Sequence, residues 1–212
     1  MSSEPPADAP SPAPDLVAAL TRERGAPLLE ALERHLPGAG EHAEATGSYA
    51  FVAAAELGQS RGRCELQRET ARLHEIGLVY VPRAMLDRPA AELGAQDAAV
   101  IEAHFEAGFR LARGAGVPEQ VCGWLLRTRE RYDGFGRGRL AAAAIPIESR
   151  ICRAACACAS LLADPADAAQ IGARASRASE ALAAAAGREL DPGVVEALAY
   201  ALDRIALGPD SI

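Results

Sequence analysis

Alanine and leucine recur through this sequence at helical spacing, and glycine or proline interrupts them at short intervals. Leu28, Leu29, Leu32 and Leu36, for example, are spaced to lie on one face of a helix. Runs of β-branched residues are nearly absent, so residue propensity and apolar periodicity both favour helices over a sheet. Half of the 212 residues are apolar, which suits one substantial core better than two. The sequence therefore predicts an all-α fold, a single compact bundle of seven or eight helices.

Breaks between the apolar segments divide the chain. Residues 1–14 combine proline, alanine, serine and acids without an apolar period, which is typical of a disordered tail. Residues 15–40 are expected to form N-terminal helices, interrupted at Gly25 and resumed at Pro27, and residues 41–208 the main helical domain. Within this domain we expect an extended segment at 78–82 and a glycine-rich loop from 133 to 144. A helix that begins at 118 is expected to run into the charged segment 127–131. The other expected helices cover 41–57, 62–76, 97–113, 147–163, 166–186 and 192–206.

Charge and cysteine content limit the possible partners. The formal net charge is −7, and all 22 basic residues are arginine, so no mechanism can use a lysine. The acidic balance argues against binding to a membrane surface or a nucleic-acid duplex, although a local basic cluster could hold an anion. Five cysteines without a secretory signal indicate reduced thiols and a cytoplasmic protein, and no apolar stretch is long enough to span a membrane.

Histidines supply the clearest chemical pattern. His42, His74 and His104 fall in three different predicted helices, and His74 is followed directly by Glu75. Imidazole nitrogens and a carboxylate that converge from several helices provide the ligands of a divalent cation. His74 and Glu75 are expected in the last turn of their helix, where the carbonyl end favours a cation. His35 fits no motif and is expected at the surface.

Several segments, in order along the chain, resemble the HD-GYP family. LHEIGLVYVP at 73–82 is similar to the family's signature, ERYDGFGRG at 130–138 to its glycine loop, and IPIESRI at 145–151 and GRELDP at 187–192 to the segments that follow. The resemblance implies an α-helical bundle of the HD-domain type that hydrolyses cyclic di-guanylate with two or three metal ions, often iron or manganese. It implies that His42, His74 and His104 match histidine ligands, and that Glu75 replaces the bridging aspartate.

The chain departs from the family at several of these positions. Thr128 and Arg129 stand where the family has two consecutive histidine ligands, Cys156 where it has the last aspartate, and Leu78 where it has a lysine. Arg137 and Gly138 replace the Tyr-Pro of the loop. Loss of both adjacent histidines removes most ligands of a second metal ion, and the Arg129 guanidinium would repel a cation but could grip a phosphate.

We therefore expect at most one divalent ion (iron, manganese or zinc), or none. Its candidate ligands are His42, His74 and Glu75, with His104 and Cys156 in addition; a Cys156 thiolate would select zinc or ferrous iron. Arg129, Arg131 and Arg150 are the candidate phosphate ligands. Each assignment has a structural alternative: a core histidine at 104, apolar packing of Cys152 and Cys156, and a solvated charged face for the arginines at 127, 129, 131, 137 and 139.

Two functional hypotheses remain, with a weaker third. The first is a degenerate HD-GYP-like domain, weak or inactive as a cyclic di-guanylate phosphodiesterase, that acts as a regulatory module in bacterial signalling. Its partners would be a cyclic dinucleotide or other phosphorylated ligand, a signalling protein, or a second copy of the chain. The second is a mononuclear metal-dependent phosphohydrolase acting on a phosphodiester or nucleotide. An HD-type oxygenase is the third, disfavoured because that chemistry also needs a fuller ligand set.

Overall fold

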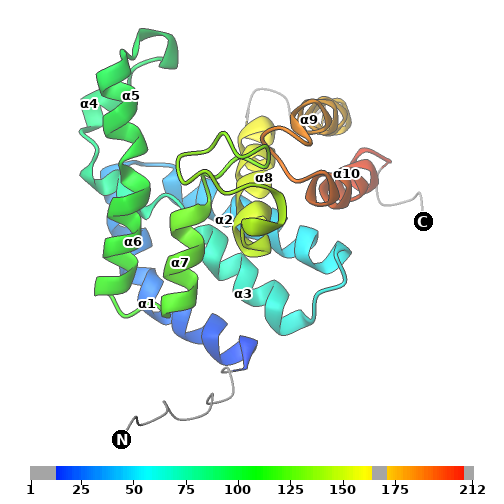
Figure 1. The fold of residues 1–212 in the computed structure, drawn as a ribbon, viewed down its shortest axis with the longest axis horizontal. Coiled ribbons are helices and arrows are strands. Elements are labelled where there is room, and N and C mark those ends of the chain that lie inside the picture. Colours follow the sequence, from blue (N-terminus) through cyan, green and yellow to red (C-terminus); the bar gives the residue numbers. More distant parts are fainter. Residues whose placement is uncertain (1–12, 164–170, 208–212) are drawn as a thin grey trace, which may run out of the picture.

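The computed structural model describes residues 13–163 and 171–207, and this part of the chain is built from helices (Figure 1). The predicted all-α bundle is confirmed. The α-helices are α1 (Pro14–His35), α2 (Ala39–Glu56), α3 (Arg61–Arg72), α4 (Arg83–Leu86), α5 (Ala95–Glu102), α6 (His104–Gly114), α7 (Glu119–Arg127), α8 (Ile147–Leu162), α9 (Ile171–Ala185) and α10 (Pro192–Leu207). Short 3-10 helices are η1 (Ile76–Tyr80), η2 (Ala90–Glu92) and η3 (Ala142–Ala144).

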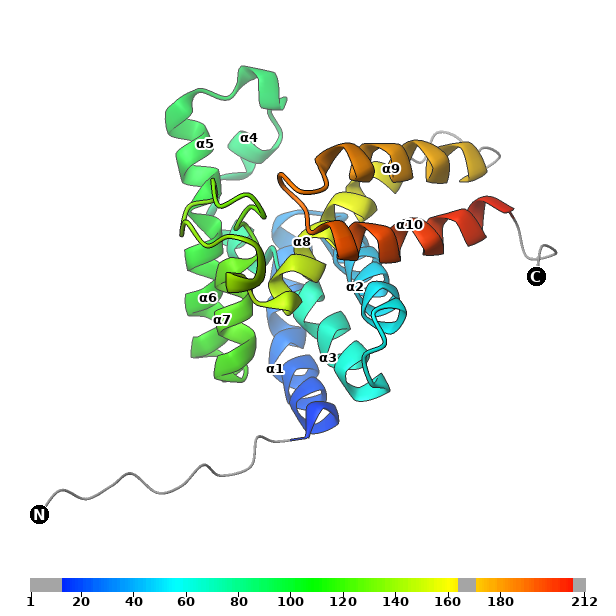
Figure 2. The ribbon, with the colours of Figure 1, turned by 45° about the vertical axis from the view of Figure 1, so that its right-hand side comes forward.

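Two apolar clusters lie on opposite sides of α3. One joins α2, α3, α8, α9 and α10 and uses many alanines and cysteines, whose small side chains let the helices approach closely, around larger residues such as Ile151, Leu182 and Leu198. The other joins α1, the end of α3, η1, α6 and α7 through Leu73 and Val121, among others. Figure 2 shows α9 and α10 on one side of the molecule and α6 and α7 on the other. Because α3 contributes to both clusters, its C-terminal end lies at the centre of the bundle.

The first helix is continuous, so the predicted interruption at Gly25 is wrong. α1 runs through Gly25 and Pro27 without a break. Gly25 is buried against Leu73, where a Cβ at position 25 would lie 2.7 Å from Leu73 Cδ2. Close packing against the neighbouring segment, rather than a chain break, explains the glycine here. Packing of buried Val17 and Leu32 on the two sides of Pro27 supports the helix despite the hydrogen bond that proline cannot make.

The segment that carries His74 also differs from the prediction. The helix expected to reach residue 76 ends at Arg72. Residues 76–80 form η1, so the segment expected to be extended, 78–82, is helical over 78–80. His74 and Glu75 thus occupy a turn between two helices rather than the last turn of one. The turn is closed by the backbone amides of Leu73 and His74, which donate to Thr70 O and Ala71 O.

The predicted helix over 97–113 is divided in two. α5 ends at Glu102 and α6 begins at His104, so His104 lies at a junction and not in the middle of a helix. No glycine or proline marks this junction in the sequence. It lies where η1 approaches most closely: a Cβ on Gly77 would come within 1.8 Å of the His104 carbonyl oxygen.

The remaining helices agree with their predicted ranges to within a few residues. These are α2, α7, α8, α9 and α10, and the glycine-rich loop between α7 and α8 is also present. Residues 166–170 of the predicted segment 166–186, and most of the predicted tail, lie outside the described residues. None of the helices described has the length and hydrophobicity needed to cross a lipid bilayer.

Candidate metal centre

Four side chains bring potential metal-binding atoms together at the centre of the bundle. His42, His74, Glu75 and Cys156 each contribute one nitrogen, oxygen or sulfur atom, and these atoms lie within 4.8 Å of one another. Glu75 is 3.9 Å from His42 Nε2 through Oε2 and 3.7 Å from His74 Nε2 through Oε1. Cys156 Sγ is 3.8 Å from His42 Nε2. Donors around a tetrahedral zinc, with bonds of about 2.0 to 2.3 Å, are separated by about 3.3 to 3.8 Å. Three of the separations here, from 3.7 to 3.9 Å, are close to that range, and a small inward movement of the side chains would bring all four donors to one ion.

Three packed segments position these donors. His42 lies in the first turn of α2, His74 and Glu75 in the turn after α3, and Cys156 in the middle of α8. α2 packs against both α3 and α8, and α3 packs against α8. Buried Ala50, Ala54, Ala71 and Ala155 at these contacts let the helices come close enough for side chains from all three segments to meet.

Hydrogen bonding fixes the tautomer of His74. The Nδ1 atom lies 2.8 Å from Ala71 O, which can only accept, so Nδ1 carries the proton and Nε2 presents a lone pair. Nε2 is buried and has no hydrogen-bond partner among the described residues. A buried polar atom without a partner is costly. A cation held between His74 and Glu75 would satisfy it.

Ionisation of the cluster is compatible with a cation. Burial lowers the pKa of His74, so its imidazole is neutral near pH 7 and can act as a ligand. Burial alone would raise the pKa of Glu75, but the histidines beside it and Arg129 hold that pKa below its usual value. Burial, with a contribution from Glu75, raises the pKa of the Cys156 thiol to about 11. Without metal the thiol is protonated, and coordination to a cation would be needed to deprotonate it.

A small cavity adjoins three of the four donors. Its volume is about 30 Å³, which matches the space of a single water molecule. His74, Glu75 and Cys156 line it together with Phe105, Thr128, Arg129, Cys152 and Arg153. The cavity therefore connects the donors to the positions where the family has its second pair of histidines.

No second set of metal ligands accompanies the first within the described chain. The Thr128 hydroxyl donates to Leu125 O, within its own helix turn. Arg129 is exposed, and its guanidinium lies 5.0 Å from the centre of the Phe105 ring. At these two positions the structure thus places a hydroxyl that is already engaged and a permanent positive charge.

His104 lies outside the group of four. Its Nδ1 donates to Ile101 O, and its Nε2 is buried without a hydrogen-bond partner in the described part of the chain. Burial is also the main cause that lowers its pKa, while Glu75 and His74 are near enough to contribute. A ligand role for His104 stays a prediction.

The three arginines predicted to bind phosphate have different surroundings. Arg129 has no carboxylate partner in residues 13–163 and 171–207. Arg131 makes two hydrogen bonds to Asp133, of 3.1 and 2.7 Å, and one to Glu189. Arg150 is engaged by Asp191 and by Ile145 O. These contacts occupy its guanidinium, and Arg150 does not line the small cavity, so its role as a phosphate ligand stays a prediction.

Two further residues differ from expectation. Arg153, which was not predicted, lines the cavity and donates to Glu189. Its one signal in the sequence is its position three residues before Cys156, which puts both side chains on the same face of α8. His35, expected at the surface, is half-buried and its Nε2 lies 2.8 Å from Val81 O.

Known proteins with related sequences are named as phosphodiesterases of cyclic dinucleotides. Residues 28–194 match the HD domain family. The chain is 32% identical over 133 residues to the cyclic di-GMP phosphodiesterase response regulator RpfG of Xanthomonas campestris pv. campestris, covering 61% of this chain and 35% of that protein. It is 30% identical over 182 residues to the 3'3'-cGAMP-specific phosphodiesterase 2 of Vibrio cholerae, covering 81% of this chain and 33% of that protein. This chain therefore spans about a third of the length of these relatives.

Solved structures share the fold. The HD-GYP protein Bd1817 of Bdellovibrio bacteriovorus superposes with a TM-score of 0.64 at 16% identity, covering 90% of this chain and 62% of that one. The PgpH HD domain of Listeria monocytogenes, in complex with cyclic di-AMP, gives 0.61 at 14% identity, covering 88% of this chain and 100% of that one. The sequence matches, supported by this common fold, show that the chain belongs to the HD domain family and confirm the resemblance to HD-GYP proteins.

Proposed function

We propose that this chain is a degenerate HD-GYP-like domain that holds one divalent ion, binds a cyclic dinucleotide or a related phosphorylated ligand, and acts as a regulatory module rather than as an efficient phosphodiesterase. The observation that carries the proposal is the grouping of His42, His74, Glu75 and Cys156 beside Thr128 and Arg129. One ion has a complete set of donors, and the positions that would serve a second ion do not offer any.

Four protein donors also limit the chemistry of a single ion. A tetrahedral ion bound by two histidines, a carboxylate and a thiolate has no open position for an activated water, as in structural zinc sites. When bound, the ion would be neutralised by the carboxylate and the thiolate, so it would hold the four side chains in place, and the charge that attracts a phosphate would come from Arg129. The protein's own contribution is to fix the His74 tautomer through Ala71 O and to keep Glu75 ionised. These roles support binding better than hydrolysis.

The ligand class follows from the relatives and from the charge next to the cavity. RpfG and the Vibrio cholerae enzyme are named for cyclic di-GMP and 3'3'-cGAMP. Arg129 lies at the cavity without a carboxylate partner among the described residues, and a guanidinium is suited to hold a phosphate by two parallel hydrogen bonds. The expected protein partner, a signalling protein or a second copy of the chain, stays a prediction, as does the cytoplasmic location.

Calorimetric titration and a hydrolysis assay with the same ligands test this proposal. We expect cyclic di-GMP or 3'3'-cGAMP to bind the full chain and to be recovered intact after prolonged incubation with zinc, manganese or ferrous iron. His74→Ala should weaken binding, whereas Glu180→Gln, an exposed position on α9, should not. Rapid turnover of either dinucleotide that disappears in His74→Ala would contradict the regulatory role.

A mononuclear phosphohydrolase is the second candidate, favoured by one observation. His42, His74 and Glu75 alone form a set of two histidines and one carboxylate, which in catalytic zinc sites leaves a fourth position for water. The two candidate functions differ in the role of Cys156. As a ligand it fills the fourth position, and otherwise that position is open to water. If the chain is a mononuclear phosphohydrolase, Cys156→Ala should hydrolyse a phosphodiester at least as fast as the wild type. If Cys156 is instead the fourth ligand in a binding module, the wild type should be inactive.

A further inference from the structure

A second and larger hollow opens beside the metal centre, and its walls are strongly basic. Its volume is about 610 Å³. Five arginines line it: Arg129, Arg131, Arg137, Arg139 and Arg153. Among the described residues, only two carboxylates, Glu102 and Glu189, share the lining. An excess of guanidinium groups in one concave site attracts anions.

The positive charge of this hollow is only partly balanced by internal ion pairs. Glu189 receives hydrogen bonds from Arg131, at 3.1 Å, and from Arg153, at 3.2 Å. Arg137 pairs with Glu106 at 3.0 Å. Arg129 and Arg139 have no carboxylate partner in the described part of the chain. These two guanidinium groups are therefore available to an external anion.

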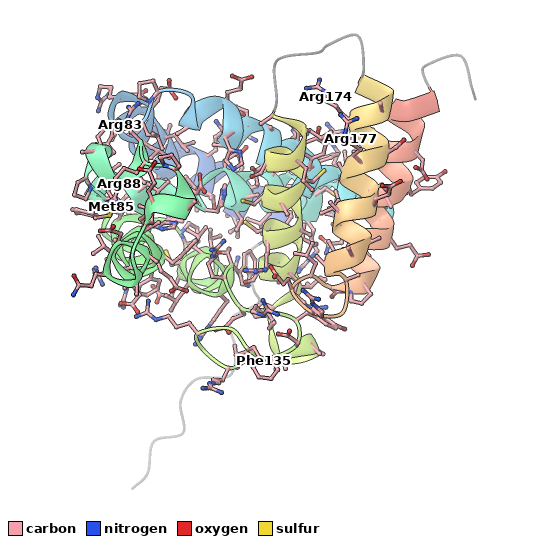
Figure 3. All side chains as sticks on the ribbon, turned by 90° about the horizontal axis from the view of Figure 1, so that it is seen from above. Arg83, Met85, Arg88, Phe135, Arg174 and Arg177 are labelled. Atoms are coloured by element: carbon pink, nitrogen blue, oxygen red, sulfur yellow. The ribbon has the colours of Figure 1, made fainter. Side chains whose placement is uncertain are left out.

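An exposed aromatic ring stands at the edge of the same hollow. Phe135 lines it and is 78% exposed, at the outer tip of the glycine-rich loop (Figure 3). The backbone amide of Phe135 donates to Asp133 Oδ1 at 3.1 Å, and Asp133 is held by Arg131, so the base of the ring is anchored. Aromatic side chains on basic surfaces provide a stacking face for nucleobases.

The hollow and the metal centre are adjacent. Arg129 and Arg153 line both the hollow and the small cavity that contains His74, Glu75 and Cys156. Because the small cavity has the space of a single water molecule, a phosphate held by Arg129 would lie in the hollow and not in the cavity. The loop residues that make the hollow basic include Arg137, one of the two positions at which the chain departs from the Tyr-Pro of the HD-GYP loop.

We propose that this basic hollow, with Arg129 and Arg139 as its free cations and Phe135 as its stacking face, is an anion subsite that holds a phosphate and a base of a nucleotide ligand. The identity of the ligand as a nucleotide rests on the proposed function. The anion subsite itself does not, because its arginines are independent of any metal ion.

Titrations of the full chain in the presence of EDTA test the subsite apart from the metal centre. Pyrophosphate probes the arginines alone, and cyclic di-GMP probes the arginines together with Phe135. We expect Arg139→Gln to weaken the binding of both probes roughly tenfold, and Phe135→Ala to weaken only cyclic di-GMP, also roughly tenfold. Arg113→Gln is the matched control, because Arg113 is an exposed arginine on α6 that is paired with Glu119.

Each outcome decides one of the two proposals. Pyrophosphate binding that Arg139→Gln leaves unchanged, or that Arg113→Gln weakens equally, overturns the subsite, as does a wild-type chain that binds neither probe. Pyrophosphate binding that depends on Arg139, in a chain that binds no cyclic dinucleotide with or without metal, supports the subsite and contradicts the proposed function. Circular dichroism of each variant verifies that it is folded.

Discussion

Asp133 is the residue that organises the glycine-rich loop. Its carboxylate accepts two hydrogen bonds from Arg131 and one from the amide of Phe135. These contacts, led by the hydrogen bond from Arg131, lower the pKa of Asp133 to about 2. A carboxyl whose pKa is depressed by folding stabilises the protein above its unfolded pKa of about 3.9, and that contribution is lost as the pH falls towards the folded value.

We therefore expect Asp133→Asn to lower the melting temperature at pH 7 and to lose this effect between about pH 4 and pH 2. Thermal melts of both proteins across this range measure the difference. Asp203→Asn on α10, which has no ion pair among the described residues, is the control. A difference between wild type and Asp133→Asn that persists undiminished at the lowest pH would show that the ion pair with Arg131 is not its source.

Individual site residues could be predicted only in part. The family's motifs identify four candidate ligands in the sequence by position, and the structure brings these four together: His42, His74, Glu75 and Cys156. Their role as ligands stays a prediction. Arg150 is a predicted phosphate ligand, and nothing in the sequence around it shows that Asp191, 41 residues away, pairs with its guanidinium. Arg153 was not predicted, because its place at the cavity depends on how α8 packs and not on any local sequence pattern.

At the scale of elements, Gly77 sets the contact between η1 and α6. A Cβ at this position would lie 1.8 Å from His104 O and 2.6 Å from Gly108 N. Both are backbone atoms, which cannot rotate away as a side chain would. We expect Gly77→Ala to reduce the free energy of unfolding by about 1 to 3 kcal/mol or more.

Chemical denaturation of matched glycine variants measures this effect. Gly123 lies on the exposed side of α7, and a Cβ there would meet no atom within 4 Å. Gly123→Ala should stabilise the protein by about 0.5 to 1 kcal/mol, because alanine is the better helix former. Equal effects of the two substitutions would mean that η1 and α6 can separate without cost.

Helices whose ends are marked by local signals were predicted well. Pro146 precedes α8, and Pro192 opens α10, because proline suits the first turn of a helix. Boundaries set by tertiary contact were not predicted. The break between α5 and α6 has no glycine or proline, and Gly25 marks the approach of Leu73 rather than the end of a helix.

At the scale of the whole molecule, the fold class follows from composition, and the candidate site follows from how the helices pack together. Alanine-rich segments at helical spacing are sufficient to predict an all-α bundle. The two apolar clusters on either side of α3 then determine which turns meet, and they bring α2, the end of α3 and α8 to one point. No local pattern contains that information, so the grouping of four donors and its contact with a basic hollow emerge only from the packed structure.

Metal analysis with cobalt substitution tests the single-ion centre and its thiolate ligand most directly. Protein purified without chelator should contain one divalent ion per chain. The cobalt form should show the charge-transfer absorption of a thiolate bound to cobalt, which Cys156→Ala removes, and His74→Ala should lose the ion altogether. Two ions per chain, or one ion retained by His74→Ala with an unchanged cobalt spectrum in Cys156→Ala, would contradict a single-ion centre with a thiolate ligand.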